Sequence, residues 1–350
     1  MITGRQSLKT VILGVETANP PHRLTQNEVL SFVTDTIKPS ERALGLYKRF
    51  LLDDGIHQRY IASDNLKNLV DESVDEKMRR FEHWAVRLAV EASRKVLLRC
   101  NDQPKDIDAI FISTCTGYLC PGLSTYVSEK LGLSEDIYTL DLVGLGCAGA
   151  LPALRAADHY LNRNPSSKVL VIAVEICTAA VHWLEKPELI LSNALFSDGA
   201  AAVLLTNKQK ASGLRINHIS SVLWPQFRDE LRFKYFDNRL CNVISSKVPK
   251  IVAQALEALY KDHSQNKMHY AFHSGGRKVL DAIQSKLGLS DEDMRPSRLV
   301  LKDYGNMSSP SVLFVLKSIL SHPMRHQDAV TCFSFGAGFL ASMLQAEWQL

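Results

Sequence analysis

The stretch DLVGLGCAGALPALRAADHYL, residues 141–161, decides the fold. It begins as an apolar strand, turns through glycines on either side of Cys147, and continues as a helical pattern. In that pattern apolar residues recur at three-residue spacing: Ala148, Leu151, Leu154 and Ala157. A strand that leads through a short turn into a helix with one apolar face is typical of layered α/β proteins. The stretch therefore predicts an α/β fold with Cys147 at a strand-to-helix turn.

The surrounding chain repeats this alternation. Strands are predicted in TVILGVE, DAIFIST, YTLDLVG and VLVIAVE, and helices over residues 78–98 and 123–131. In the first helix one apolar stripe is formed by Phe81, Trp84, Leu88 and Ala92. A helix with one apolar stripe buries it against a neighbouring layer. We therefore expect helix 78–98 to pack on a sheet.

A weak internal repeat indicates a duplicated architecture. FSDGAAAVLL at 196–205 resembles FSFGAGFLASML at 333–344, and LRINHISSV after Gly213 is a counterpart of the N-terminal VILGVETANP. Repeated order of this kind favours two related halves over two unrelated domains. We predict an N-terminal half over 1–210 that carries Cys147 and a C-terminal half over 211–350.

Composition excludes several protein classes. The chain has 350 residues, 46% hydrophobic and 22% charged, with a net charge of +4. This is globular composition, and the small, dispersed charge predicts no nucleic-acid or membrane partner. The longest aliphatic run, 169–174, is too short to span a bilayer. With no secretory signal found, we expect a cytoplasmic protein.

The seven cysteines predict neither a metal site nor a disulfide framework. None has the CxxC spacing of a metal ligand pair, and the number is odd. Gly144-x-Gly146-x-x-Gly149 matches a dinucleotide-binding fingerprint, but strand-and-helix units precede it and Cys147 interrupts it. We therefore predict no cofactor. The alternative for Cys147 itself is a buried structural residue.

Three residues stand in contexts that suit chemistry. A thiol at a helix N-terminus can have its pKa lowered from about 8.5 to roughly 3.5–7.5, which makes Cys147 a candidate nucleophile. His273 follows an apolar run and precedes two glycines in AFHSGG, so it is expected at a strand end facing a cleft. Asn306, in DYGNMSSPSVLF, is likewise expected at a strand-to-helix turn.

These three motifs, in this order, resemble those of type III polyketide synthases, the chalcone-synthase-like branch of the thiolase superfamily. The resemblance covers nearly the whole chain and includes STCTGYLCPGLS and ALFSDGAAA. It implies the five-layered αβαβα thiolase fold with two pseudo-repeated halves, and a homodimer. The family's substrates are acyl groups on pantetheine thioesters, carried by coenzyme A or by an acyl carrier protein.

The resemblance also implies roles for individual residues. Cys147 would hold the growing acyl chain and pair with His273 as a thiolate–imidazolium couple, while His273 and Asn306 would stabilise the enolate of the extender unit. Claisen attack on the acyl-Cys147 thioester would follow. Phe196 would be the gatekeeping phenylalanine, and small residues would line a roomy cavity: Cys115, Thr116, Cys177, Ala180 and Ser308. Cys120 would reach the partner subunit's cavity.

This sequence departs from the family pattern at positions that are expected to bind the acyl donor. Of three basic positions that hold coenzyme A phosphates, Arg49 is retained, while Leu46 and Asp53 replace the others. Asn242 replaces a second gatekeeping phenylalanine, which predicts long or bulky acyl chains. We expect delivery by an acyl carrier protein, with Lys48, Arg49 and Arg277 facing its acidic surface or a coenzyme A phosphate.

The resulting hypothesis is a condensing enzyme that releases a pyrone or resorcinol-type product. One form of this hypothesis has it use long β-ketoacyl chains bound to a carrier protein, in which case no decarboxylation is needed. One alternative is an initiating β-ketoacyl carrier-protein synthase of fatty-acid synthesis, which uses the same Cys, His and Asn set. Another is a non-catalytic thiolase-fold partner.

Overall fold

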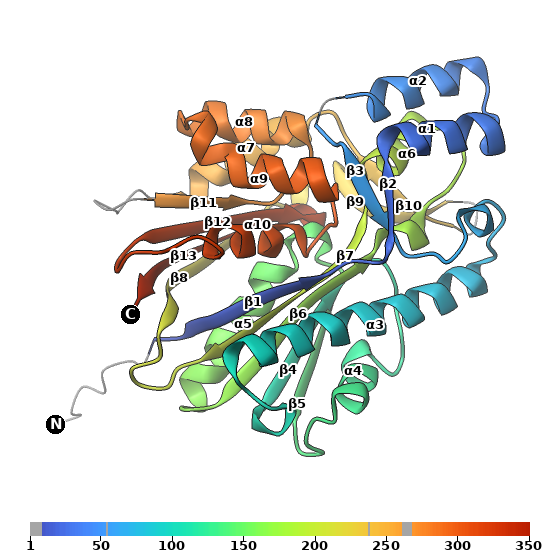
Figure 1. Cartoon of the computed structure of the whole chain (residues 1–350). Helices are drawn as coiled ribbons and strands as arrows, with labels where there is room; N and C mark the ends of the chain where they lie inside the picture. The colour runs from blue at the N-terminus through green and yellow to red at the C-terminus, as the bar shows by residue number, and fades with distance from the viewer. Residues whose placement is uncertain (1–8, 54, 237–238, 261–267) are drawn as a thin grey trace.

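The computed structural model describes residues 9–53, 55–236, 239–260 and 268–350 (Figure 1). Nine strands form a hydrogen-bonded sheet in the order β11-β12-β13-β8-β1-β7-β6-β4-β5. Their bounds are β1 (Val11–Ala18), β4 (Ala109–Thr114), β5 (Tyr138–Val143), β6 (Lys168–Ile176), β7 (Asp198–Thr206), β8 (Gly213–Leu223), β11 (Met268–Phe272), β12 (Ala329–Gly336) and β13 (Leu340–Gln349). The four strands predicted from sequence are confirmed as β1, β4, β5 and β6.

The sheet consists of two runs of strands with the same internal order. In one run β4 and β6 are parallel, β7 is antiparallel to β6, and β1 is antiparallel to β7. In the other run β11 and β12 are parallel, β13 is antiparallel to β12, and β8 is antiparallel to β13. The runs are joined where β1 and β8 pair at two positions. The predicted boundary near residue 210 falls between β7 and β8.

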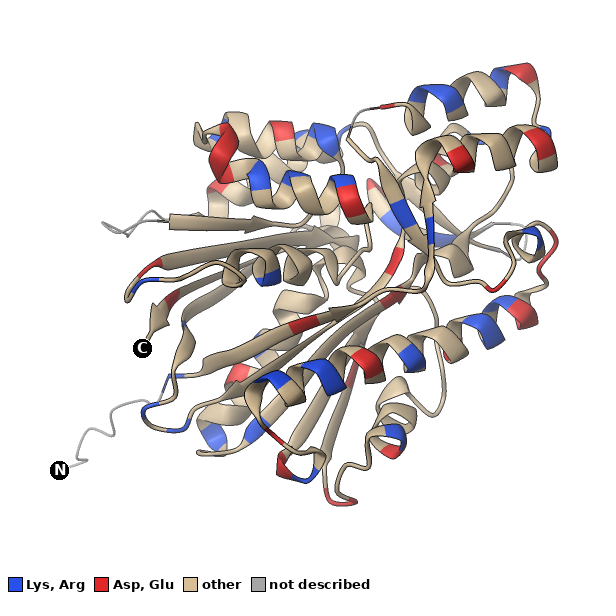
Figure 2. Ribbon diagram, viewed as in Figure 1, with Lys and Arg blue, Asp and Glu red and all other residues tan. Residues whose placement is uncertain are grey.

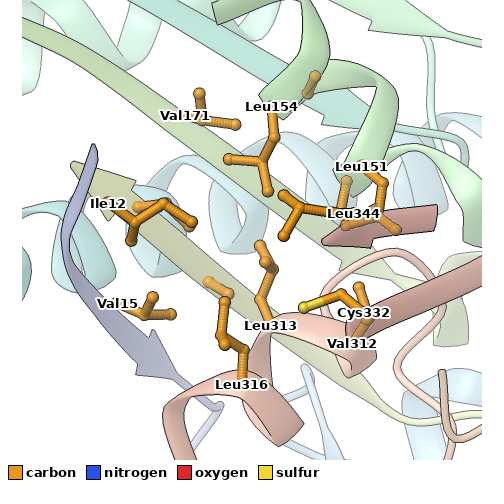
Figure 3. Close-up of a cluster of buried hydrophobic side chains, with 14 of the residues drawn as sticks. Ile12, Val15, Leu151, Leu154, Val171, Val312, Leu313, Leu316, Cys332 and Leu344 are labelled. Carbon is orange, nitrogen blue, oxygen red and sulfur yellow. The ribbon is translucent and has the colours of Figure 1, made fainter. Parts of the chain in front are cut away.

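Two helices, α5 (Ala150–Arg163) and α10 (Ser311–Leu320), lie between the two runs of strands. A single buried cluster contains Leu151 of α5 and Leu313 of α10 together with Val171 from one run and Leu344 from the other (Figure 3). Burial of this apolar surface from both sides fixes the two runs relative to each other. The middle layer therefore forms the shared core.

Further helices cover the outer faces of both runs. The first run is covered by α3 (Val74–Cys100) and α4 (Leu123–Leu131), and the second by α7 (Val248–Leu259), α8 (Arg277–Leu287) and α9 (Asp291–Tyr304). The predicted helices 78–98 and 123–131 are thus confirmed, and Phe81, Trp84, Leu88 and Ala92 are buried against the sheet as expected. The result is the five-layered αβαβα arrangement.

A smaller group of elements covers one end of the layers. Its members are β2 (His22–Thr25), β3 (Gln58–Ile61), α1 (Gln26–Phe32), α2 (Glu41–Leu51), α6 (Pro187–Leu195), β9 (Leu231–Phe236) and β10 (Arg239–Ile244). A small apolar cluster joins α1, α2 and α6. Lys, Arg, Asp and Glu alternate on the outer helices, as Figure 2 shows. Over the described ranges, no helix combines the length and apolar character needed to cross a bilayer.

Candidate active site

Cys147 lies in a short 3-10 turn, Gly146–Ala148, between β5 and α5. Gly146 has φ of +55°, and a Cβ on it would lie 2.8 Å from the backbone nitrogen of Ala337. A Cβ on Gly336 would lie 2.9 Å from the backbone nitrogen of Cys147. Only glycine permits both approaches. The C-terminal SFGAG loop is therefore packed against the Cys147 backbone, a role that sequence reasoning did not assign to Gly336.

The Cys147 thiol does not have the environment expected from the sequence. Its side chain is buried, and burial raises its pKa to about 12. Ser308 Oγ donates to Cys147 Sγ at 3.2 Å and lowers the pKa only in part. Burial therefore opposes the ionised thiol expected from the sequence, because loss of solvation raises the pKa more than the Ser308 hydrogen bond lowers it.

Asn306 is placed by a helix rather than by a strand. α9 ends at Tyr304, Gly305 follows with φ of +68°, and α10 begins at Ser311, so the predicted strand-to-helix turn is a helix-to-helix turn. Asn306 Oδ1 accepts from the backbone nitrogen of Ser308 at 2.8 Å. This bond supports Ser308 in its left-handed conformation, φ +61°, beside Cys147.

His273 directly follows β11 and precedes α8, as the sequence predicts. Its ring packs edge-on against Phe335, with centroids 5.0 Å apart. A Cβ on Gly275 would lie 3.4 Å from His273 Nε2, and the carbonyl of Gly275 accepts from Asn306 Nδ2 at 3.2 Å. Gly275 thus brings His273 and Asn306 together. A Cβ at this position would lie only 2.7 Å from Phe335 Cζ, so a side chain would displace the ring that packs on His273.

The imidazole of His273 is buried and neutral. Neither ring nitrogen has a hydrogen-bond partner within the described part of the chain, and burial lowers its pKa to about 3. Burial thus favours the uncharged form of both Cys147 and His273 and opposes the thiolate–imidazolium couple expected from the sequence.

A narrow cavity adjoins Cys147. Its walls include the predicted residues Thr116, Cys177, Ala180, Phe196, Asn242 and Ser308, together with Ser192, Asn193 and Phe233, which sequence reasoning missed. Its volume is about 20 Å³, room for about one water molecule. The prediction of a roomy cavity is therefore wrong. Phe233, which pairs with Asn242 across the β9–β10 hairpin, contributes a bulky aromatic wall.

Cys115 belongs to a neighbouring polar cluster centred on Glu175. Glu175 is fully buried and accepts from Cys115 Sγ at 3.2 Å, from Thr116 Oγ1 at 2.8 Å and from Ser309 Oγ at 2.7 Å. Cys115 Sγ also lies 3.5 Å from Ser308 Oγ, which links the cluster to Cys147. The role of Glu175 in this cluster was not predicted, because the sequence places it inside an apolar strand and its partners lie elsewhere in the chain.

The predicted donor-binding cations are not equivalent. Lys48 and Arg49 are exposed in the last turn of α2. Arg277, at the start of α8, forms a two-pronged ion pair with Asp53, at 2.7 and 2.8 Å. Asp53, one of the departures from the family pattern, thus binds the cation that was expected to face the donor. Cys120 is exposed.

Comparisons with known proteins identify the family to which this chain belongs. Residues 13–221 match the family model of the FAE1/type III polyketide synthase-like proteins, and residues 226–343 match the C-terminal domain of chalcone and stilbene synthases. The 3,5-dihydroxyphenylacetyl-CoA synthase of Streptomyces toyocaensis is 27% identical, with 96% of this chain and 90% of that protein covered. The alpha-pyrone synthesis polyketide synthase-like Pks18 of Mycobacterium tuberculosis is 26% identical, with 94% and 88% covered.

A solved structure extends the agreement to three dimensions. PKS-I from the brown alga Ectocarpus siliculosus matches with a TM-score of 0.89 and 25% identity, covering 99% of this chain and 100% of that chain. The predicted thiolase-like fold is thereby confirmed. The matched family is also the one predicted from the sequence, rather than the initiating carrier-protein synthases weighed as an alternative. The chain belongs to the type III polyketide synthases, and it is an acyltransferase that condenses acyl units.

Proposed function

We propose that Cys147, His273 and Asn306 are the catalytic residues and that the acyl chain grows on Cys147. One observation carries this proposal: a chain of contacts connects all three residues in one buried site. Ser308 binds Cys147 Sγ, and Asn306 binds the backbone of Ser308. Gly275 accepts from Asn306 Nδ2, and its backbone nitrogen donates to the carbonyl of His273. The side chains come from distant parts of the sequence, so only a specific fold brings them together.

The neutral state of the site defines how the first step proceeds. A neutral imidazole is a proton acceptor, so His273 takes the Cys147 proton as the sulfur attacks the donor thioester. A carbon–sulfur bond forms to Cys147, and the donor thiol leaves with a proton. The negative charge therefore develops only during attack. In this proposal the resting Cys147–His273 pair carries no charge.

Asn306 and His273 then act on the extender unit. Asn306 Nδ2 donates one hydrogen to Gly275 and keeps a second for a thioester carbonyl. With His273 as the other donor, this carbonyl can carry the enolate charge formed by decarboxylation or by deprotonation of a β-ketoacyl unit. The enolate carbon attacks the acyl-Cys147 carbonyl and forms the new carbon–carbon bond, while the carbon–sulfur bond to Cys147 breaks. The sulfur leaves as a thiolate and takes up a proton, which restores the thiol.

The donor, in this proposal, is a pantetheine thioester delivered by an acyl carrier protein. The Asp53 carboxylate repels the phosphates of coenzyme A and already neutralises Arg277. Lys48 and Arg49 remain exposed for the acidic surface of a carrier protein. Coenzyme A itself is the competing donor, and the name of one relative, 3,5-dihydroxyphenylacetyl-CoA synthase, contains it.

The product is proposed to be a pyrone or resorcinol-type ring. The relative named for alpha-pyrone synthesis supports the first of these. The narrow cavity favours short chains over the long β-ketoacyl chains considered from the sequence, because any acyl group on Cys147 must displace the lining side chains.

A homodimer is also part of the proposal. β5 is the last strand of the sheet, and its Tyr138 and Val143 side chains are each 51% exposed. An open strand edge with exposed apolar side chains is a ready surface for a second copy. Sedimentation velocity at micromolar concentration should give twice the mass of one chain. A monomer would contradict this part of the proposal.

Intact-protein mass spectrometry tests the catalytic proposal. The purified enzyme is incubated with a panel of acyl-coenzyme A and acyl carrier-protein donors, alongside Cys147→Ala as a matched control. An adduct of acyl mass on the wild type and none on the variant is expected, with faster labelling from carrier protein. An adduct retained by Cys147→Ala would overturn the role of Cys147. Equal acylation rates with coenzyme A and carrier-protein donors would overturn the proposed preference for a carrier protein, but not the role of Cys147.

A further inference from the structure

Two polar atoms in the wall of the Cys147 cavity have no partner in the protein. Ser192 Oγ and Asn242 Oδ1 are both buried, and neither has a hydrogen-bond partner among the residues that the structure describes. The residues themselves are only 7% and 6% exposed, and both line the cavity. Burying a hydroxyl or a carbonyl oxygen without a partner is unfavourable, so such groups call for a functional explanation.

The neighbouring residue shows that the region can satisfy its polar groups. Asn193, next to Ser192 on α6 and also in the cavity wall, donates to Tyr47 Oη at 3.1 Å and to the carbonyl of His182 at 2.8 Å. Asn193 therefore holds the wall together. Ser192 Oγ and Asn242 Oδ1 make no such bond, although both residues line the cavity that adjoins Cys147.

The chemistry of the two atoms is complementary. Asn242 Oδ1 is an acceptor and needs an O–H or N–H group from a ligand. Ser192 Oγ can donate its hydrogen to a carbonyl oxygen. A 1,3-dicarbonyl unit in its enol form carries an O–H group and a carbonyl oxygen on alternate carbons. A saturated alkyl chain carries neither, and would leave both protein atoms unpaired.

We propose that Ser192 and Asn242 form a polar subsite that selects acyl chains with an oxygen on the β-carbon, bound as the enol of a 1,3-dicarbonyl unit. This inference rests on the proposed role of Cys147 as the acyl carrier. Phe233, opposite Asn242 in the β9–β10 ladder, limits the same space to a short chain. The subsite therefore favours short, oxygenated chains over long aliphatic ones.

The test compares two thioesters of equal chain length. Acetoacetyl-pantetheine and butyryl-pantetheine differ at the β-carbon and carry no phosphate, so donor recognition does not enter the comparison. The rate of Cys147 acylation by each is followed by intact-protein mass spectrometry. The wild type is expected to prefer acetoacetyl by on the order of tenfold or more, because butyryl leaves the buried groups unpaired.

Two variants test whether Ser192 and Asn242 cause this preference for the acetoacetyl group. Ser192→Ala and Asn242→Leu should each reduce the preference severalfold, mainly by slowing acetoacetyl transfer. Ser128→Ala is the matched control, because Ser128 Oγ is also buried without a described partner but does not line the cavity. It should keep the wild-type ratio.

The possible outcomes separate the two proposals. Acylation of the wild type without preference, or a preference unchanged in both variants, would overturn the subsite. Absence of acylation by either thioester would instead count against the proposed function of Cys147. Because the readout is a ratio of two rates in the same protein, partial misfolding of a variant does not alter the conclusion.

Discussion

Glu175 and His273 are both buried titratable residues near Cys147, but their surroundings differ completely. Glu175 accepts hydrogen bonds from side chains and backbone of neighbouring residues, Cys115 and Thr116 among them. The His273 backbone is hydrogen-bonded to Phe333 and Gly275, but neither ring nitrogen has a hydrogen-bond partner in the described ranges, and the ring packs on Phe335. A side chain whose polar atoms are all used stabilises the structure, whereas one with unused atoms remains available to a substrate. The comparison therefore indicates a structural role for Glu175 and a catalytic role for His273.

The largest effect is expected for His273→Gln. The variant removes the proton acceptor for Cys147, and general-base catalysis contributes roughly 10²- to 10⁴-fold. Single-turnover acylation should slow by that factor, while the thermal unfolding midpoint changes little, since no hydrogen bond is lost. A loss below tenfold would refute the role of His273 in proton transfer.

The second effect concerns pH. Because burial raises the pKa of Cys147 to about 12, the thiolate fraction should rise about tenfold per pH unit from pH 6 to pH 9 without levelling off. Iodoacetamide alkylation of Cys147, followed by peptide mass spectrometry, measures this. Exposed Cys120 in the same sample is an internal reference for an accessible thiol. If the alkylation rate of Cys147 levelled off near pH 7 instead, the thiolate–imidazolium pair expected from the sequence would be supported.

The smallest effect is expected for Glu175→Gln. The amide keeps the shape but loses charge and one acceptor oxygen, so the free energy of unfolding should fall by about 1–3 kcal/mol. Urea denaturation measures this change. Cys147 acylation should slow less than tenfold. If folded Glu175→Gln lost as much acylation as His273→Gln, Glu175 would have a catalytic role, and the proposed difference between the two residues would be wrong.

Much of the fold could be predicted because its signals are local. The apolar spacing of helix 78–98 and the strand runs before Cys147 and His273 depend only on neighbouring residues, and the structure has them as α3, β5 and β11. Asn306 was misplaced because the segment before it, LVLKDY, contains enough apolar residues to suggest a strand. It forms the end of α9, whose first turn is capped by Ser290 and Asp293.

The site was predicted less completely, because its properties depend on burial. Cys115 and Cys177 are small residues, which suggested space, but the cavity is narrow and one of its walls is Phe233, from a hairpin far along the chain. Glu175 and Ser192 carry no motif. Their importance is visible only when their partners, or the absence of described partners, are known.

The sequence by itself determined the class of fold, the order of its strands and helices, and the three motifs with Cys147, His273 and Asn306. These follow from spacing and from residue type, which are properties of the chain alone. Only the tertiary structure decided the ionisation of the site and the size of its cavity. Both depend on how far water is excluded and on which distant side chains fill the space, and neither quantity is encoded in any local stretch.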